Sequence, residues 1–78
     1  MLSGAQCRMA RALLRWSVQE LADRSGVGTT TIKRIELQDS VLEGAQVRTL
    51  QAIAKAFTDT GNVRFEGING LFLQNKLK

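Results

Sequence analysis

Apolar positions in the N-terminal half recur at the spacing of an α-helix rather than of a β-strand. Ser3 followed by Gln6 is the sequence signature of a capping box and predicts a first helix from about Gly4 to Leu14. At about 100° per residue, one side of this helix is apolar and the opposite arc is cationic. The apolar side holds Cys7, Met9, Ala10, Leu13 and Leu14, and the cationic arc holds Arg8, Arg11 and Arg15.

A second capping signature, Ser17 with Glu20, predicts that another helix begins at Val18. This helix is short because Ser25-Gly26 supplies a stop, since glycine tolerates the left-handed conformation that ends helices. The sequence therefore predicts two helices within the first 26 residues.

A third helical pattern begins just beyond that stop, with Gly28 or Thr29 as its cap. Two short helices joined by a turn of about three residues that contains glycine are typical of a helix-turn-helix, so residues 17–36 predict this unit. The inward side of the third helix is mostly apolar, and its outward side is small, hydroxylated and basic. The inward residues are Thr31, Ile32 and Ile35, and the outward residues are Thr29, Thr30, Lys33 and Arg34.

The rest of the chain first predicts a loop and a fourth helix. Residues 37–45 show no steady period and indicate the loop. The fourth helix is expected from about Ala45 to Thr58 and ends before Gly61. Its apolar stripe comprises Val47, Leu50, Ile53, Ala54 and Phe57.

The C-terminal segment changes to the period of a strand, which predicts a small hairpin over about residues 62–74. Four apolar residues share one face only if residues 67–69 form a three-residue loop. A two-residue turn at residues 69–70 would mix the faces. The preferred register pairs Phe65 with Leu71 and Val63 with Leu73.

Composition limits what such a chain can do. Its 78 residues suffice for one compact domain, expected to span residues 1–78. No apolar run approaches the ~20 residues of a membrane span, so no membrane association is expected. One cysteine cannot form an internal disulfide, which favours a reducing, cytoplasmic compartment. With no histidine, no metal-ligand spacing and no glycine-rich phosphate loop, we expect no catalytic residue, no metal and no cofactor.

Charge is distributed unevenly along the chain, whose net charge is +4. Six basic residues against three acidic ones precede Gln38, whereas residues 39–66 carry three against four. The excess positive charge thus lies in the N-terminal half. A basic face of this kind suits a polyanion.

The segment 17–36 resembles the helix-turn-helix of the Cro and lambda-repressor type, which is the XRE class of bacterial and phage regulators. A small residue at the helix crossing, a glycine at the turn and two packing residues beneath the recognition helix have the spacing of this family. These residues are Ala22, Gly26, Ile32 and Ile35. Residues 49–57 are also similar to the fourth helix of the family. The resemblance implies a mainly α, four-helix lambda-repressor-like domain, here with a small C-terminal β-hairpin.

The resemblance also implies an ion pair between Arg11 and Glu36, which would tie the first helix to the end of the recognition helix. The chain departs from the family in the loop after Glu36, which is longer than usual, and in ending in a hairpin instead of a fifth helix. Dimer geometry is therefore not carried over.

A helix that enters the major groove needs a first turn without bulk, side chains that reach base edges, and cations nearby. Gly28, Thr29, Thr30 and Lys33 meet these requirements. Arg34 lies at the edge of the same face, where it can serve either a base or a phosphate. These five residues are the candidates for contact with double-stranded DNA.

Phosphate contacts are expected at the start of the second helix. Ser17 and Gln19 are the candidates, helped by backbone N–H groups of the first helical turn. The family usually has glutamine directly after the capping serine, whereas this chain has Val18 there and Gln19 follows.

Two functions remain open at this point. The first is a sequence-specific transcriptional regulator, a repressor that binds two half-sites as a homodimer. The second is a protein-binding module that uses the helix-turn-helix core or the hairpin to hold a regulator or a polymerase subunit. Fold alone does not separate them.

Overall fold

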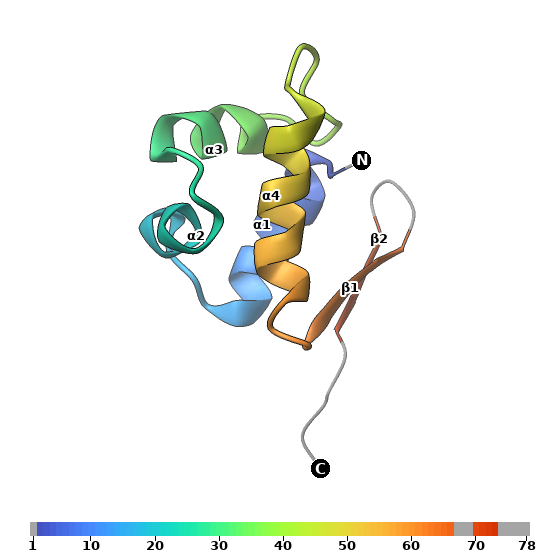
Figure 1. Ribbon diagram of the computed structural model, residues 1–78. Helices are drawn as coiled ribbons and strands as arrows, with labels where there is room; N and C mark the ends of the chain where they lie inside the picture. Colours follow the sequence, from blue (N-terminus) through green and yellow to red (C-terminus); the bar gives the residue numbers. More distant parts are fainter. Residues whose placement is uncertain (1, 67–69, 74–78) are drawn as a thin grey trace.

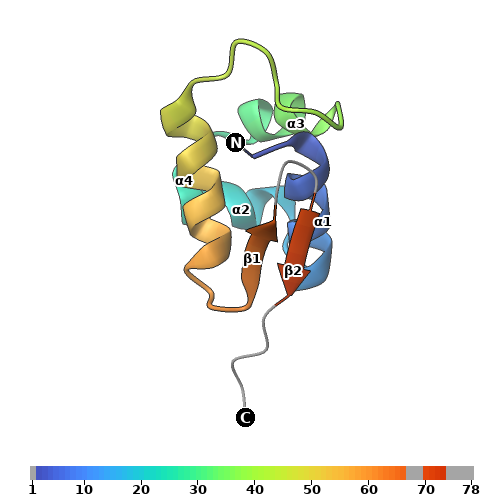
Figure 2. The same cartoon turned by 90° about the vertical axis from the view of Figure 1, so that its right-hand side faces the viewer.

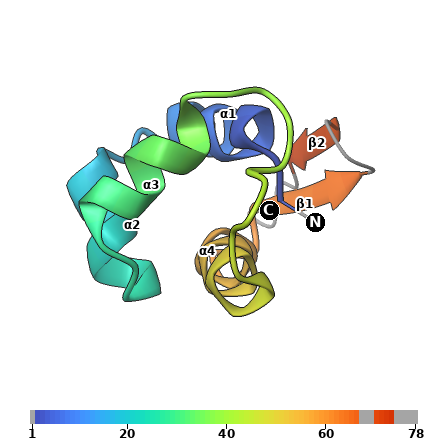
Figure 3. The same ribbon diagram turned by 90° about the horizontal axis from the view of Figure 1, so that it is seen from above.

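The structure, a computed structural model, describes residues 2–66 and 70–73, and within these ranges it contains four helices and one two-stranded sheet. The mainly helical class expected from the sequence is confirmed. The elements are α1 (Gly4–Leu14), α2 (Val18–Ser25), α3 (Thr29–Glu36), α4 (Val47–Thr58), β1 (Val63–Glu66) and β2 (Gly70–Leu73). Figure 1 and Figure 3 show α1 and α4 between the α2–α3 pair on one side and the hairpin on the other.

Local capping signals place the ends of the first two helices. At α1 the capping box is complete: Gln6 N donates to Ser3 Oγ (3.1 Å), and Ser3 N donates to Gln6 Oε1 (3.0 Å). At α2 Ser17 Oγ accepts from Glu20 N (3.0 Å), but the Glu20 carboxylate accepts from Arg24 Nε (2.5 Å) instead of completing the box. The second capping box is therefore only half formed.

The buried face of α1 differs from the predicted stripe. Cys7 and Ala10 are buried, and Leu14 packs against the core, as expected. Met9 and Leu13, however, are 39% and 48% exposed. Both residues lie at the border of the apolar stripe. The packing of α1 on α3 and α4 orients the helix so that Gln6, an uncharged residue one turn before Ala10, is buried.

Packing of α4 shows a similar difference at its first turn. Leu50, Ile53 and Phe57 are buried as predicted, but Val47 is 48% exposed and Ala56 is buried instead. The helix begins at residue 47 rather than near residue 45, so Val47 lies at the end of the helix and beyond the core. The core as a whole comprises Leu2, Cys7, Ala10, Leu21, Ala22, Ile32, Ile35, Leu50, Ile53, Ala56, Phe57 and Val63.

An aromatic row connects the start of α2 to the hairpin through α4. The rings of Trp16 and Phe57 are stacked with centroids 5.5 Å apart, and Phe57 meets Phe65 edge-on at 6.1 Å. The guanidinium of Arg24 lies over the Trp16 ring, 4.4 Å from its centroid. These contacts hold three elements together on one side of the core.

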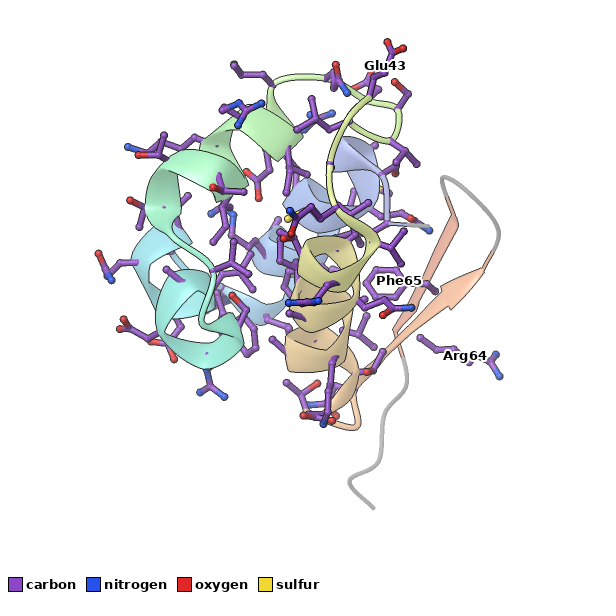
Figure 4. The ribbon with its side chains drawn as sticks, turned by 45° about the horizontal axis from the view of Figure 1, so that its top comes forward. Glu43, Arg64 and Phe65 are labelled. Carbon is purple, nitrogen blue, oxygen red and sulfur yellow. The ribbon has the colours of Figure 1, made fainter. Side chains whose placement is uncertain are left out.

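The hairpin has the register expected from the alternation of apolar residues. Val63 pairs with Leu73 and Phe65 with Leu71, which leaves residues 67–69 between the strands. Figure 2 shows β1 on the α4 side and β2 on the α1 side, and both strands contact these helices. In Figure 4, Phe65 points toward the helices and Arg64 points away from them. The side chains of Leu71 and Leu73, which this register places on the same face as Val63 and Phe65, lie outside the described ones.

Candidate nucleic-acid interface

The turn between α2 and α3 has a glycine at each end, as the sequence predicts. Gly26 caps α2 with φ +75°, a left-handed conformation that favours glycine. Gly28, and not Thr29, is the N-cap of α3, with extended dihedral angles and no side-chain cap. Val27 packs on the core between them, and its N–H donates to Ser25 Oγ (3.2 Å). The turn thus fixes α3 against α2 and leaves Gly28 exposed.

The first turns of α3 divide as the sequence predicts. Ile32 and Ile35 are fully buried beneath the helix. Thr30, Lys33 and Arg34 are exposed, while Thr29 is half-buried at the edge of the same surface. The structure therefore brings the five α3 candidates, Gly28, Thr29, Thr30, Lys33 and Arg34, onto one outward surface.

Polar groups on this outward surface have no partner among the described side chains. Within residues 2–65, the side chains of Thr29, Thr30, Lys33 and Arg34 make no hydrogen bond or ion pair. The nearby carboxylate of Glu36 is held by an arginine of α1. Positive charge on α3 is thus left uncompensated, together with a row of free hydroxyl donors and acceptors.

At the start of α2, Ser17 and Gln19 are both exposed, but their polar groups are already in use. The Ser17 hydroxyl oxygen accepts from Glu20 N and keeps its own hydrogen for another acceptor. Gln19 Nε2 donates to Asp23 Oδ1 (2.9 Å), which leaves one amide hydrogen and places a carboxylate beside it. Ser17 is therefore well placed for an anion, whereas Gln19 has an acidic neighbour that opposes one.

Beneath the outward surface, the Glu36 carboxylate is bound by side chains of α1. Arg11 donates to both of its oxygens, from Nε to Oε2 (2.9 Å) and from Nη2 to Oε1 (2.8 Å). Arg11 Nη1 also donates to Trp16 O (3.0 Å), and Cys7 Sγ donates to Glu36 Oε2 (3.0 Å). Only 9% of the Glu36 side chain and 23% of the Arg11 side chain are exposed. The ion pair implied by the family resemblance is confirmed, in bidentate and largely buried form.

Electrostatics in this cluster favour the charged pair. Burial alone would raise the pKa of Glu36, but hydrogen bonds from Arg11 and Cys7 and the charges of Arg11 and Arg8 lower that pKa below its usual value. The hydrogen bond to Glu36 raises the pKa of Arg11. Burial, together with the hydrogen bond to Glu36, raises the pKa of the Cys7 thiol. Cys7 is therefore a neutral donor and not a reactive thiolate.

Arg8 lies on the cationic arc that the sequence predicts, but its guanidinium is bound by other parts of the protein. Its Nη1 donates to the backbone oxygens of Glu36 and Gln38 (3.2 Å for the second), and its Nη2 forms an ion pair with Asp39. Helical spacing alone does not distinguish Arg8 from Arg11, because both lie on one helical arc and the partners of Arg8 are 28 to 31 residues away. The structure thus adds Arg8 as a clamp on the segment after α3.

Gly4 allows this segment to approach α1 closely. Gly4 N donates to Ser40 O (3.0 Å) and Ala5 N donates to Asp39 O (3.1 Å). A Cβ atom on Gly4 would lie 1.8 Å from Gln38 O and 2.4 Å from Ile35 O. Glycine is therefore required by a close backbone approach, a role that local sequence does not reveal.

Metal-ligating clusters and membrane-spanning helices are two further features that the described residues can be checked for. No cluster of three or more metal-ligating side chains occurs among those residues. None of the helices in residues 2–66 is long and apolar enough to cross a membrane. Comparison of the chain with protein-family models, curated proteins and solved structures gave no match. Inferences about function therefore rest on the residues themselves.

Proposed function

We propose that this protein is a sequence-specific DNA-binding transcriptional regulator with a lambda-repressor-like fold. In this proposal α2 and α3 form the helix-turn-helix, and α3 enters the major groove of duplex DNA. The proposal rests chiefly on one observation: the outward surface of α3 holds unpaired hydroxyl and cationic groups, while Glu36 at its end is neutralised by Arg11. Such a surface presents donors and positive charge to a polyanion without a competing carboxylate.

Each α3 candidate has a distinct part in this mechanism. Thr30 and Lys33 are exposed in the first turns, where they can contact base edges, and Thr29 lies at the border of the same surface. Threonine can hydrogen-bond a base or touch a thymine methyl, and lysine can donate to the acceptors of guanine. Gly28 lets the helix approach the groove without bulk, and Arg34 serves a phosphate at its edge. Base specificity would come from Thr29, Thr30 and Lys33, and affinity for the phosphate backbone would come from the positive charges of Lys33 and Arg34.

Ser17 is the proposed phosphate contact on α2, through its free hydroxyl hydrogen. Gln19 is a weaker contact than Ser17, since it must share its amide with Asp23. Its second amide hydrogen would still be available to a phosphate.

A homodimer on two half-sites fits the proposal. The hairpin lies on the opposite side of α1 and α4 from the α2–α3 pair, so a contact between two hairpins would leave both α3 surfaces free for DNA (Figure 1). Two-fold symmetry in the protein would then match a palindrome whose half-sites are about one helical turn, ~34 Å, apart. A regulator of this kind would work in the cytoplasm as a repressor.

The first test is duplex binding across a series of salt concentrations. Duplexes are selected from a randomised library by the parent protein, and binding is followed by fluorescence anisotropy. We expect the logarithm of the association constant to fall linearly with the logarithm of salt concentration, by about 0.9 for each phosphate contacted. Lys33→Ala should weaken the selected duplex by about 1–3 kcal/mol. Its matched control is Lys55→Ala, which removes an exposed lysine of α4 paired with Asp59 and should leave binding nearly unchanged.

A protein-binding module is the second candidate, and one observation favours it. Met9 and Leu13 lie one turn apart on α1 and are 39% and 48% exposed, which gives α1 an apolar surface away from α3. Absence of duplex binding at low salt, with a normal circular dichroism spectrum, would exclude the regulator and favour this alternative.

A further inference from the structure

Leu37, directly after α3, stands out in its exposure. At 84% it is the most exposed of the large apolar side chains within residues 2–65. It retains right-handed helical dihedral angles (φ −66°, ψ −16°), so it continues the path of α3 by one residue. Leu37 follows Thr30 by seven residues, which at about 100° per residue places it within about 20° of Thr30 around the helix axis. An apolar side chain thus extends the candidate DNA-contacting surface.

The outward position of Leu37 is fixed by Arg8. Arg8 Nη1 donates to the carbonyl oxygens of Glu36 and Gln38, the residues on either side of Leu37. The close approach of Gly4 to Gln38 O holds the same segment against α1. The backbone on either side of Leu37 is thus held against α1, while the Leu37 side chain is exposed.

The surroundings of Leu37 favour an anionic partner with apolar groups of its own. Lys33 and Arg34 are exposed on the same outward side of α3 and have no ion pair with any side chain of residues 2–65. A partner that covers Leu37 must therefore bring negative charge beside a small apolar contact. The major groove of DNA has this combination, because thymine methyl groups project into it between two phosphate backbones.

We propose that Leu37 is a specificity-determining residue that packs against the 5-methyl group of a thymine in the bound DNA, with Arg8 as its positioning residue. The inference rests on the proposed DNA-binding function and adds to it a preference for one base. It also gives a role to an exposed leucine whose two neighbouring carbonyl oxygens accept from Arg8 at the end of the recognition helix.

The experiment removes the methyl group and the leucine separately. Duplexes selected by the parent protein are remade with deoxyuridine in place of one thymine at a time, a change that deletes only the 5-methyl group. At one position we expect the parent to bind about fourfold more weakly, the value of roughly one buried methyl. Leu37→Ala should bind the thymine duplex about as weakly and show no further loss with deoxyuridine at that position.

The matched control is Leu13→Ala, the same truncation at an exposed leucine of α1, which should respond to deoxyuridine like the parent. Equal responses of the parent and Leu37→Ala at every thymine would overturn the role of Leu37 while leaving DNA binding intact. A change in the sedimentation of Leu37→Ala without any change at thymine would also overturn it and would assign Leu37 to a contact between protein chains. Failure of the parent to select any duplex would overturn the proposed function, and this inference with it.

Discussion

The two sides of α3 use their polar groups in opposite ways. On the inward side, Glu36 is bound by Arg11 and Cys7, and the following backbone is bound by Arg8. On the outward side, Lys33 and its neighbours have no partner in the part of the protein described by the structure. Under the proposed function, the inward side of this short helix contributes stability and the outward side contributes DNA binding. Substitutions on one side should therefore change the free energy of unfolding, and those on the other should change affinity.

The largest loss of stability is expected from Arg11→Met, on the inward side of α3. The substitution leaves Glu36 charged, 9% exposed and without its bidentate partner. Removal of one partner of a buried pair should lower the free energy of unfolding by about 3–5 kcal/mol. This loss is measured by urea unfolding followed by circular dichroism. Lys55→Met, which breaks the exposed pair with Asp59, should cost less than ~1 kcal/mol, and equal losses for the two variants would contradict a buried role for Arg11.

Gly4→Ala tests the backbone approach on the inward side. Its Cβ would lie 1.8 Å from Gln38 O, so α1 or the segment after α3 must shift and weaken the bonds from Gly4 N and Ala5 N. We expect a loss of about 3 kcal/mol in the free energy of unfolding, the upper part of the range for overpacking. Gly28→Ala is the control, because a Cβ there meets nothing within 4 Å. It should cost no more than ~1 kcal/mol, the value of a poorer helix cap.

Acid should lower the free energy of unfolding through Glu36, on the inward side of α3. The pKa of Glu36 is lowered in the folded protein, so the ionised carboxylate contributes stability above its unfolded pKa of about 4.3. This contribution is lost as pH falls through the lower folded pKa. Unfolding measured between about pH 6 and pH 3 should show the parent losing stability. In Arg11→Met this slope should shrink, because the carboxylate loses the partner that favours its charged form, and an unchanged slope would assign the acid sensitivity to other carboxylates.

The smallest effects on stability are expected from the outward side. Thr30→Ala and Lys33→Ala remove exposed side chains without internal partners, so the free energy of unfolding should change by less than about 0.5 kcal/mol. Their effect on the selected duplex should be larger, about 1–3 kcal/mol. Stability loss without loss of binding would reverse the assignment of the two sides.

Much of the fold was predictable because its signals are local. Ser3 and Gln6 lie three residues apart and begin α1, and Gly26 ends α2 with a positive φ. The register of the hairpin followed from the alternation of Val63 and Phe65 with their partners across it. The sequence also placed Thr30 and Lys33 outward, because the buried positions of Ile32 and Ile35 fix the rotation of a regular helix.

Other features were decided only by the tertiary structure, because they depend on contacts between elements that are distant in the sequence. The partners of Arg8 lie 28 to 31 residues away and Glu36 lies 25 residues from Arg11, whereas helical spacing alone placed both arginines on one cationic arc. The exposure of Met9 depends on the angle at which α1 packs, and the need for glycine at residue 4 depends on a carbonyl of another segment. Local sequence determines where helices begin, end and turn apolar faces inward, since those interactions span about four residues. The clamp of Arg8 on the segment after α3 and the exposure of Leu37 arise only when α1 and the end of α3 come together in space.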